Sequence, residues 1–322
     1  MRAMLNLTFI AFFIAALASM SADAQVATLE GVTPDRCDFS IPGGCGARDA
    51  IVFVHGIYGG RDTFKNARTG FDWPSELPNS IEGNWLDVFK LNYQSALLAW
   101  ARGANPSFDQ LARDVRSALK PLRIGGYRSI GFIAHSLGGN VVSTYVHSVK
   151  TQFGHSQRSQ NAFIITLATP VLGAQIANLA SILKSRLLMS DPLLTSLKSG
   201  NLYLTMLQEF RELEDEKEGK KVCRPVNLHA AVEKKYLGPL LVVTPGSAAR
   251  PISDFVKSPI VGFDLNHLDI AKPERIESGV YIWVLDRLVQ EYMRINNWEE
   301  AHLSFPEQHK LCEREEFLPE TP

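Results

Sequence analysis

Seven short apolar runs, each closed by turn residues, punctuate the chain. The runs have the length of β-strands, and the segments between them space their apolar residues as helices do. Strands that alternate with helices build a parallel sheet, so we expect an α/β fold with a mostly parallel central sheet and helices on both faces. The runs are Asp49–Gly56, Leu86–Tyr93, Ser129–Ser136, Ala162–Pro170, Val226–Glu233, Gly238–Pro245 and Ser258–Leu265.

Three of the intervening segments carry helix signals. The segment "SFDQLARDVRSALKPL" opens with Ser107, a residue type that caps helix N-termini. A second helix is predicted over Gly138–Val149, directly after the third run. A third is predicted near Glu274–Ile295, where Pro273 comes just before the helical spacing begins.

The length of 322 residues fits one large domain, because the sequence has no linker rich in proline, glycine or serine and no internal repeat. We assign residues 25–322 to this domain and residues 296–322 to a polar C-terminal tail. Residues 173–222 break the rhythm of strand and helix. Apolar residues at helical spacing are followed there by the charged run "RELEDEKEGKK", so we expect a helical insertion over the edge of the sheet.

The N-terminal residues 1–24 have the pattern of a secretory signal peptide. Arg2 gives a positive start, Leu5–Ala18 is almost entirely apolar, and Ala22-Asp23-Ala24 has the small residues of a cleavage site. The apolar stretch is shorter than the roughly 20 residues that span a bilayer. We therefore expect cleavage after Ala24 and a secreted or periplasmic protein.

The mature chain keeps four cysteines, an even number in a protein bound for an oxidising compartment. Four cysteines allow three pairings. Proximity in the sequence favours Cys37–Cys45, which leaves Cys223–Cys312 as the second disulfide. No closely spaced group of cysteine and histidine indicates a zinc site, so we expect no metal.

The charge balance argues against nucleic acid as a partner. The chain has 33 basic and 34 acidic residues, a formal net charge of -1, so it has no field that would attract polyanions. The sequence also lacks an HExxH motif, a P-loop and a dinucleotide-binding fingerprint. We expect no cofactor.

The stretch "GFIAHSLGGNVV" places Ser136 between an apolar run and a predicted helix. A strand that turns sharply into a helix needs small residues two positions on either side, and Ala134 and Gly138 provide them. Such a turn exposes the serine hydroxyl above the sheet. It also leaves the N–H of Leu137 at a helix N-terminus, where it can stabilise an oxyanion. The glycine-rich loop after "IVFVHG" offers the N–H of Ile57 as a second donor.

Five stretches in this order, "VFVHGIYGG", "GFDWP", "AHSLGGN", "LATPVLGA" and "NHLDIAKP", resemble the bacterial lipase and esterase branch of the α/β-hydrolase family. The resemblance covers roughly residues 50–294. It implies an α/β-hydrolase fold in which the insertion at residues 173–222 takes the place of a cap or lid. Ala134 replaces the first glycine of the family's elbow motif, which is a small change.

A neutral serine needs a base, and chain order in this fold runs serine, acid, histidine. His267 follows a short apolar run and precedes the last helix, as this order requires. The other histidines after Ser136 fit less well, because they precede the acid, lie inside a strand or fall in the tail: His147, His155, His229, His302 and His309. His55 and His135 are expected to hold the two loops by hydrogen bonds.

The acid must accept the other imidazole N–H and stabilise the imidazolium. Glu233 ends the fifth run, where the resemblance places the acid, and it is the first choice. Asp254 is the alternative because it lies in the loop before His267, and Asp264 is the third candidate. Glu233 also has lysines at 234 and 235, so an ordinary surface charge is a competing interpretation.

These residues together predict an exported serine hydrolase that cleaves carboxylic esters through an acyl-enzyme intermediate. Its partner would be a small-molecule or lipid ester, with transient contact to a lipid surface. An acyltransferase that uses an alcohol acceptor would need the same residues, and a non-catalytic lipid-binding protein could use the same scaffold. The sequence does not indicate the oligomeric state or the length of the acyl chain.

Overall fold

The computed structural model describes residues 27–33, 37, 44–45, 48–56, 59–81, 85–93, 108–153, 160–170, 226–236 and 259–303. The predicted run Gly238–Pro245, the insertion at 173–222 and the leader at 1–24 lie outside these residues. Ile57, Asp254, Cys223 and Cys312 also lie outside them.

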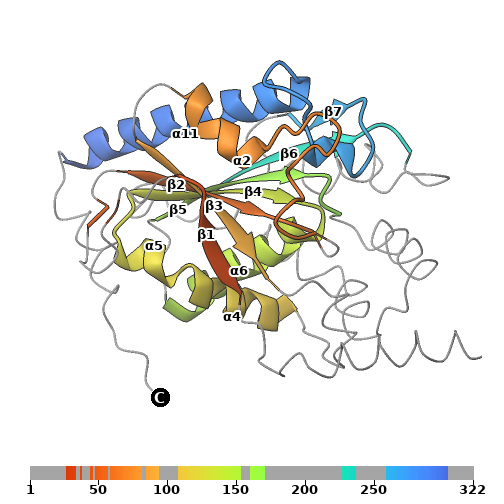
Figure 1. Ribbon diagram of the computed structural model, residues 1–322. Coiled ribbons are helices and arrows are strands. Elements are labelled where there is room, and N and C mark those ends of the chain that lie inside the picture. Colours follow the sequence, from red (N-terminus) through yellow and green to blue (C-terminus); the bar gives the residue numbers. More distant parts are fainter. Residues whose placement is uncertain are drawn as a thin grey trace, which may run out of the picture.

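A seven-stranded sheet in the order β1-β3-β2-β4-β5-β6-β7 forms the centre of the described part (Figure 1). The first strand pairs antiparallel with β3, and all other neighbours are parallel. The strands are β1 (Thr28–Gly31), β2 (Asp49–Val54), β3 (Leu86–Asn92), β4 (Ser129–His135), β5 (Asn161–Leu167), β6 (Asn227–Glu233) and β7 (Val261–Phe263). The predicted α/β fold is confirmed.

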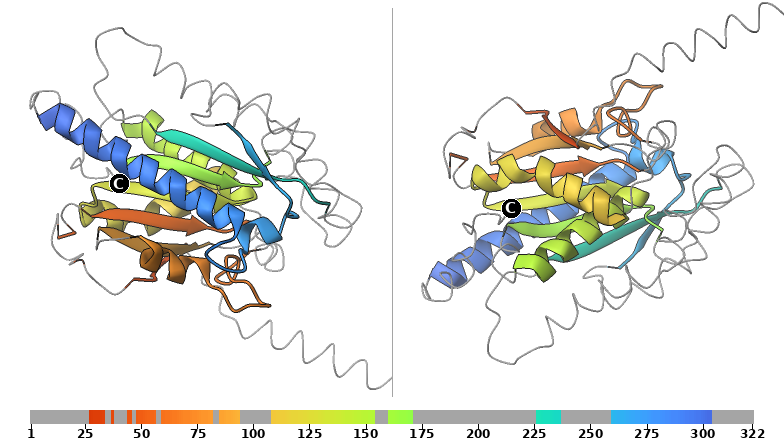
Figure 2. Two further views of the ribbon diagram at one scale, coloured as in Figure 1. Left: turned by 90° about the horizontal axis from the view of Figure 1, so that it is seen from above. Right: turned by 90° about the horizontal axis from the view of Figure 1, so that it is seen from below.

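Helices cover both faces of the sheet. On one face lie α4 (Phe108–Ala118), α5 (Lys120–Ile124) and α6 (Leu137–Phe153). On the other lie α2 (Trp73–Glu76) and α11 (Gly279–Leu303), and Figure 2 shows α11 running obliquely across the strands. Two short 3-10 turns complete the described elements, η1 (Leu77–Ser80) and η3 (Asp269–Ala271).

Alternation along the strands creates the two cores. In β2, Val52 and Val54 belong to the core under α4 and α6, whereas Ile51 and Phe53 belong to the core under α2 and α11. Successive side chains of a strand point to opposite faces, so a continuous apolar run such as β2 is suited to a sheet covered on both sides.

Two predicted helices differ from the observed ones at their ends. The last helix begins at Gly279, because the Ser278 hydroxyl accepts hydrogen bonds from the N–H groups of Glu274 and Arg275 and keeps them in a turn. It continues to Leu303, into the segment expected as tail. The helix expected from Ser107 is divided into α4 and α5, and Pro121 lies in the first turn of α5.

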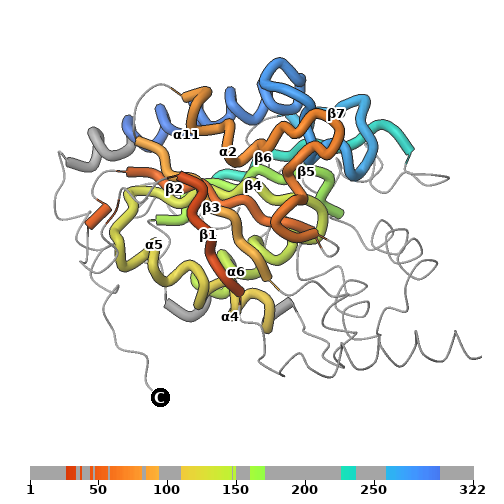
Figure 3. The backbone as a smooth tube through the Cα atoms, viewed as in Figure 1, coloured from red at the N-terminus to blue at the C-terminus, as the bar shows by residue number. Residues whose placement is uncertain are grey.

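Each parallel strand presents its carboxyl end at the same edge of the sheet. Figure 3 traces the chain through the sheet, in which β1 and β7 are the edge strands. Ser136, Glu233 and His267 lie at or just beyond the carboxyl ends of β4, β6 and β7. The topology therefore brings together residues that are far apart in the sequence.

Cys37 and Cys45 form a disulfide with a Cα–Cα distance of 4.5 Å. This is the pairing that their proximity in the sequence favours. The disulfide connects the segment after β1 to the segment before β2. None of the helices among the described residues has the length and apolarity to cross a membrane.

Candidate active site

Ser136 lies in the sharp turn between β4 and α6. Its φ angle is 53°, in the left-handed region that residues other than glycine seldom adopt. Three hydrogen bonds hold its backbone in place. Its N–H donates to the Leu167 carbonyl at 2.9 Å, and its carbonyl accepts from the Thr169 hydroxyl at 3.0 Å and from the Gly139 N–H at 3.1 Å.

Small residues let the end of β2 approach this turn closely. A Cβ at Gly138 would lie 2.4 Å from the His55 carbonyl oxygen, and a Cβ at Gly56 would lie 2.9 Å from the Ser136 Cβ. Ala134 is fully buried and pairs with Val54 and Thr166 in the parallel ladder. The sheet therefore accommodates the alanine that replaces the family's first elbow glycine.

The structure brings Ser136, His267 and Glu233 into one chain of hydrogen bonds. His267 Nε2 lies 2.9 Å from Ser136 Oγ, and His267 Nδ1 lies 3.2 Å from Glu233 Oε1. All three side chains are buried, and the exposed fraction of Glu233 is 0%. The interpretation of Glu233 as a surface charge is therefore wrong.

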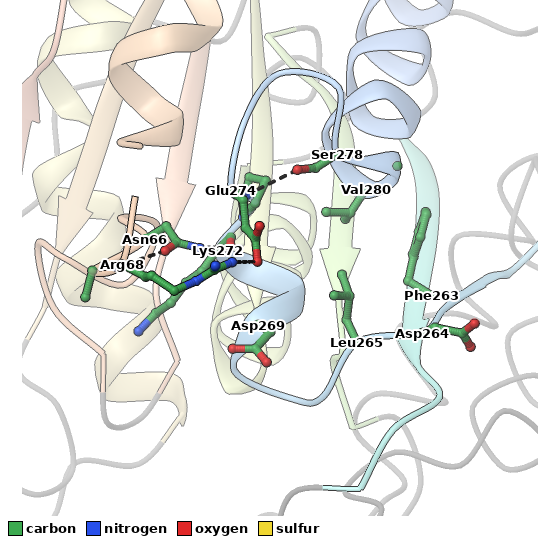
Figure 4. A pocket seen from close by; sticks show the side chains of 13 residues that line it. Asn66, Arg68, Phe263, Asp264, Leu265, Asp269, Lys272, Glu274, Ser278 and Val280 are labelled. Carbon is green, nitrogen blue, oxygen red and sulfur yellow. Dashed lines mark hydrogen bonds and ion pairs between the residues drawn. The ribbon is translucent and has the colours of Figure 1, made fainter. Parts of the chain in front are cut away.

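Among the described carboxylates, Glu233 is the one that is hydrogen bonded to His267. Asp264 instead lines a pocket that does not include Ser136 or His267 (Figure 4). Asp254 cannot be compared with them, since it lies outside the described residues.

His267 is carried by a short loop between β7 and η3. The Asn266 side-chain oxygen accepts hydrogen bonds from the N–H groups of Leu268 at 2.9 Å and Asp269 at 3.0 Å, which closes the loop on itself. The N–H of Lys235 donates to the Leu265 carbonyl at 3.1 Å and ties the loop to the segment after β6.

Leu137 is the first residue of α6, so its N–H belongs to the first turn of a helix, where backbone donors have no partner within the helix. Leu137 directly follows Ser136 in the sequence, so this N–H lies in the residue next to the hydroxyl-bearing one. Ile57, the other expected oxyanion donor, lies outside the described residues, but Gly56 just before it is packed against Ser136.

His55 holds the end of β2 through both ring nitrogens. Its Nδ1 donates to the Gly56 carbonyl at 2.7 Å, and its Nε2 accepts from the Tyr93 N–H at 3.4 Å. The rings of His55 and Tyr93 stack with their centroids 4.2 Å apart. Burial lowers the pKa of His55, so the neutral ring that these contacts require is the favoured form.

Three residues that stabilise this region had no predicted role. Thr169 bonds the Ser136 carbonyl, Asn140 donates to the Pro170 carbonyl at 3.1 Å, and Tyr93 stacks on His55. Thr169 and Asn140 lie within the stretches that carry the resemblance, and Tyr93 ends a predicted strand. Their position near the carboxyl ends of predicted strands is the sequence feature that could have indicated this role.

One pocket of about 660 Å³ lies beside the loop of His267 (Figure 4). Phe263, Leu265 and Val280 form an apolar wall, and an ion pair between Arg68 and Glu274 faces it. Ser136 and His267 are not among its lining residues, so this pocket is separate from the hydroxyl and imidazole. No cluster of three or more metal-ligating side chains occurs in the described part of the chain.

The sequence of residues 47–223 matches the protein family described as "Putative serine esterase (DUF676)". This range is more than half of the chain and contains Ser136 and the loop after β2. The chain belongs to this serine esterase family. Membership in the family and the observed topology make it a serine-esterase-like hydrolase with the α/β-hydrolase fold. The match ends before Glu233 and His267.

Solved structures of esterases and lipases are similar to this member of the serine esterase family. Esterase B from Lactobacillus rhamnosis, in a C6-C4 SN3 inhibited form, has 12% identity and a TM-score of 0.47, covering 94% of this chain and 99% of its own. Lipase BlEst2 from Bacillus licheniformis has 17% identity and a TM-score of 0.46, covering 80% and 97%. A lipase-esterase related protein from Clostridium acetobutylicum has 14% identity and a TM-score of 0.43, covering 82% and 99%. No curated protein matches the sequence.

Proposed function

We propose that the chain is an exported serine esterase that cleaves carboxylic esters through an acyl-enzyme intermediate. The observation that carries the proposal is the chain of contacts from Ser136 Oγ to His267 Nε2 at 2.9 Å and from His267 Nδ1 to Glu233 Oε1 at 3.2 Å. A nucleophile bonded to a base that is oriented by a third group is the arrangement that activates a serine.

In the first step Ser136 Oγ attacks the carbonyl carbon of the ester while His267 Nε2 takes the hydroxyl proton. The carbonyl oxygen becomes an oxyanion, which the N–H groups of Leu137 and Ile57 stabilise. The C–O bond to the alcohol then breaks, and the alcohol leaves with the proton from His267. The product of this step is an ester of the acyl group with Ser136.

Water completes the cycle by the same route. His267 removes a proton from water as its oxygen attacks the acyl carbon, and the second tetrahedral intermediate collapses to release the carboxylic acid. The proton on His267 returns to Ser136 Oγ. Glu233 accepts the Nδ1–H of His267 throughout, which keeps Nε2 free to accept a proton and stabilises the imidazolium in each step.

The proposed substrates are esters of lipids or of short to medium acyl chains. Two large exposed side chains support contact with an apolar partner: Tyr236, three residues after Glu233, is 64% exposed, and Leu268, directly after His267, is 46% exposed. They follow β6 and β7 at the same edge of the sheet as Ser136. Exposed apolar side chains beside a site favour substrates with an apolar part.

Export is proposed from two features. Residues 1–24 have the signal-peptide pattern, and the Cys37–Cys45 disulfide is of the kind that persists in oxidising compartments. The N-terminal sequence of the mature protein, purified from the periplasm or medium of its host, tests this part, and we expect it to start at Gln25.

The activity is tested with p-nitrophenyl esters of increasing acyl length. We expect turnover by the wild-type protein and a loss of at least about a thousandfold in kcat for Ser136→Ala, because the acyl-enzyme can no longer form. Ser148→Ala, a serine of the same helix whose hydroxyl donates to the Tyr145 carbonyl, is the matched control and retains activity. A folded Ser136→Ala protein with wild-type turnover would refute the proposal.

A further inference from the structure

We propose that His135 is a positioning residue that fixes the main chain of the base His267 relative to the strand that carries Ser136. The inference rests on the proposed function and deepens it. His135 ends β4, directly before the nucleophile, and its Nε2 lies 2.7 Å from the backbone oxygen of His267. The ring centroids of His135 and His267 are 5.1 Å apart, and the two ring planes are tilted by 46°.

The contact defines which nitrogen of His135 carries the proton. A carbonyl oxygen can only accept a hydrogen bond, so Nε2 must be the donor. His135 is buried, and burial together with the neighbouring His267 lowers its pKa to about 3. The ring is therefore neutral over the whole pH range in which an esterase operates, and the donor is always present.

The charges around His135 act in the same direction. His267, Lys272 and His55 all disfavour a proton on its ring. When His267 becomes an imidazolium during acyl transfer, a second cation in contact with it would oppose the step. A neutral histidine supplies the hydrogen bond without this repulsion and without competing for the proton of Ser136.

The hydrogen bond from His135 to the backbone oxygen of His267 helps to set the position of the His267 ring. Apart from the contacts of the ring itself with Ser136 and Glu233, bonds of the loop connect it to itself, through Asn266, and to the segment after β6, through Lys235. The His135 contact connects it to β4. Because Ser136 follows His135 in the same chain, the nucleophile and the main chain of its base share one anchor. A displacement of about 1 Å between reacting groups can cost about a hundredfold in rate.

Three substitutions of His135 separate positioning from packing. Glutamine places an N–H donor where Nε2 of histidine lies, asparagine is one methylene too short to reach the same point, and leucine fills space without a donor. We expect His135→Leu and His135→Asn to lower kcat for p-nitrophenyl butyrate by about 10- to 100-fold with KM within about twofold. His135→Gln should recover kcat to within about threefold of wild type.

His229→Leu is the matched control, since His229 is another buried histidine of the sheet and is bonded to Glu291 on α11. We expect it to lower the unfolding temperature while kcat per folded molecule stays at the wild-type value. His135→Leu with wild-type kcat, or a folded His135→Gln as slow as His135→Asn, would overturn the inference. If the leucine variant does not fold, the asparagine and glutamine pair decides.

The result can be separated from a failure of the proposed function. If the wild-type protein neither turns over p-nitrophenyl butyrate nor reacts with a fluorophosphonate, the proposed function itself is wrong. If wild type is active and Ser136→Ala is not, the His135 variants test the positioning role alone.

Discussion

At the scale of single residues, the site depends on a backbone conformation that side chains disfavour. The left-handed φ of Ser136 costs on the order of 1–2 kcal/mol. Hydrogen bonds with Leu167, Thr169 and Gly139 hold the turn, and the close approach of Gly56 and Gly138 leaves no room for a Cβ. The turn therefore persists only as part of the packed edge of the sheet.

Gly138→Ala tests this packing. Its Cβ would meet the backbone oxygens of His55 at 2.4 Å and Val54 at 2.7 Å, which cannot move without shifting β2. We expect a loss of about 1–3 kcal/mol in the free energy of unfolding, measured in urea, and a lower kcat. Gly279→Ala is the control because its Cβ would make ordinary contacts with Phe263 at 3.7 Å. Equal stability of the two variants would contradict the packing argument.

Glu233→Gln tests the identity of the acid. Glutamine keeps the shape of the side chain but removes the charge that stabilises the imidazolium and fixes its tautomer. We expect kcat to fall by about a hundredfold to ten-thousandfold, with the protein folded by circular dichroism. Asp254→Asn should keep most of the activity. The opposite pattern would transfer the role to Asp254.

Positions at this scale are predictable from the sequence where a motif restricts the local geometry. Ser136 was predictable because a tight strand-to-helix turn demands small neighbours, and His267 because of its order in the chain. Glu233 remained one of three candidates, since burial decides between a surface charge and an orienting acid and burial depends on the whole fold. The contact of His135 with the backbone of His267 joins positions whose proximity appears only in three dimensions.

At the scale of elements, α11 is bound to the sheet by a buried polar cluster as well as by its apolar face. Glu291 accepts hydrogen bonds from Asn227 and His229, both at 2.8 Å, and from Arg294 at 2.6 Å. Arg294 also donates to the Ala162 carbonyl at 2.9 Å. The cluster joins α11 to β5 and β6, the latter being the strand that ends in Glu233.

This cluster predicts an acid-sensitive contribution to stability. Burial alone would raise the pKa of Glu291, but the bond from His229, the charge of Arg294 and the bond from Asn227 outweigh it, and the pKa is lowered. A carboxyl with a lowered pKa in the folded state stabilises the protein above its unfolded pKa, and this stability is lost as the pH falls through the folded value. The contribution is therefore fully present near neutrality, begins to fall below about pH 4.5, and is lost as the pH passes through the lowered pKa of Glu291.

Thermal unfolding between pH 7 and pH 3 measures the effect. We expect Glu291→Gln to lower the unfolding temperature at pH 7 and to flatten its fall at acid pH. Asp286→Asn, at an exposed position of the same helix, should follow the wild-type profile. A wild-type slope in Glu291→Gln would show that another group causes the acid sensitivity.

The elements were predictable in proportion to their apolar pattern. The strands β2 to β6 carry runs buried on both faces, so periodicity and length identified them. The edge strand β1 escaped prediction because "TLEG" is short, polar in part and incompletely buried. The start of α11 was placed too early because the turn that Ser278 closes has the same residue types as a first helical turn.

At the scale of the whole molecule, the chain combines structural polar networks at one edge of the sheet with the proposed catalytic groups at the other. Asp49 and Asp87, at or near the amino ends of β2 and β3, are paired with Arg128 and Arg48. Ser136, His267 and Glu233 gather at the carboxyl edge. This separation lets one edge serve stability and the other chemistry, as parallel α/β sheets generally do.

The Cys37–Cys45 disulfide predicts a measurable dependence on oxidising conditions. Closing a loop with a sequence separation of 8 restricts the unfolded chain, an effect worth about 2–3 kcal/mol in the entropic account. The Cys37→Ser, Cys45→Ser double variant should lose that amount in urea unfolding and keep wild-type kcat, because the disulfide lies near the amino edge of the sheet. A reductant should lower the stability of the wild type more than that of the double variant, which keeps only the predicted Cys223–Cys312 disulfide; equal responses would contradict this role.

The central claim is that Ser136 is an activated nucleophile. Its most direct test is reaction of the folded protein with a fluorophosphonate, followed by mass spectrometry of the peptides. The account predicts one covalent adduct on Ser136 that forms in the wild type and far more slowly in His267→Ala. Absence of an adduct on folded protein, or labelling at another residue with Ser136 unmodified, would contradict it.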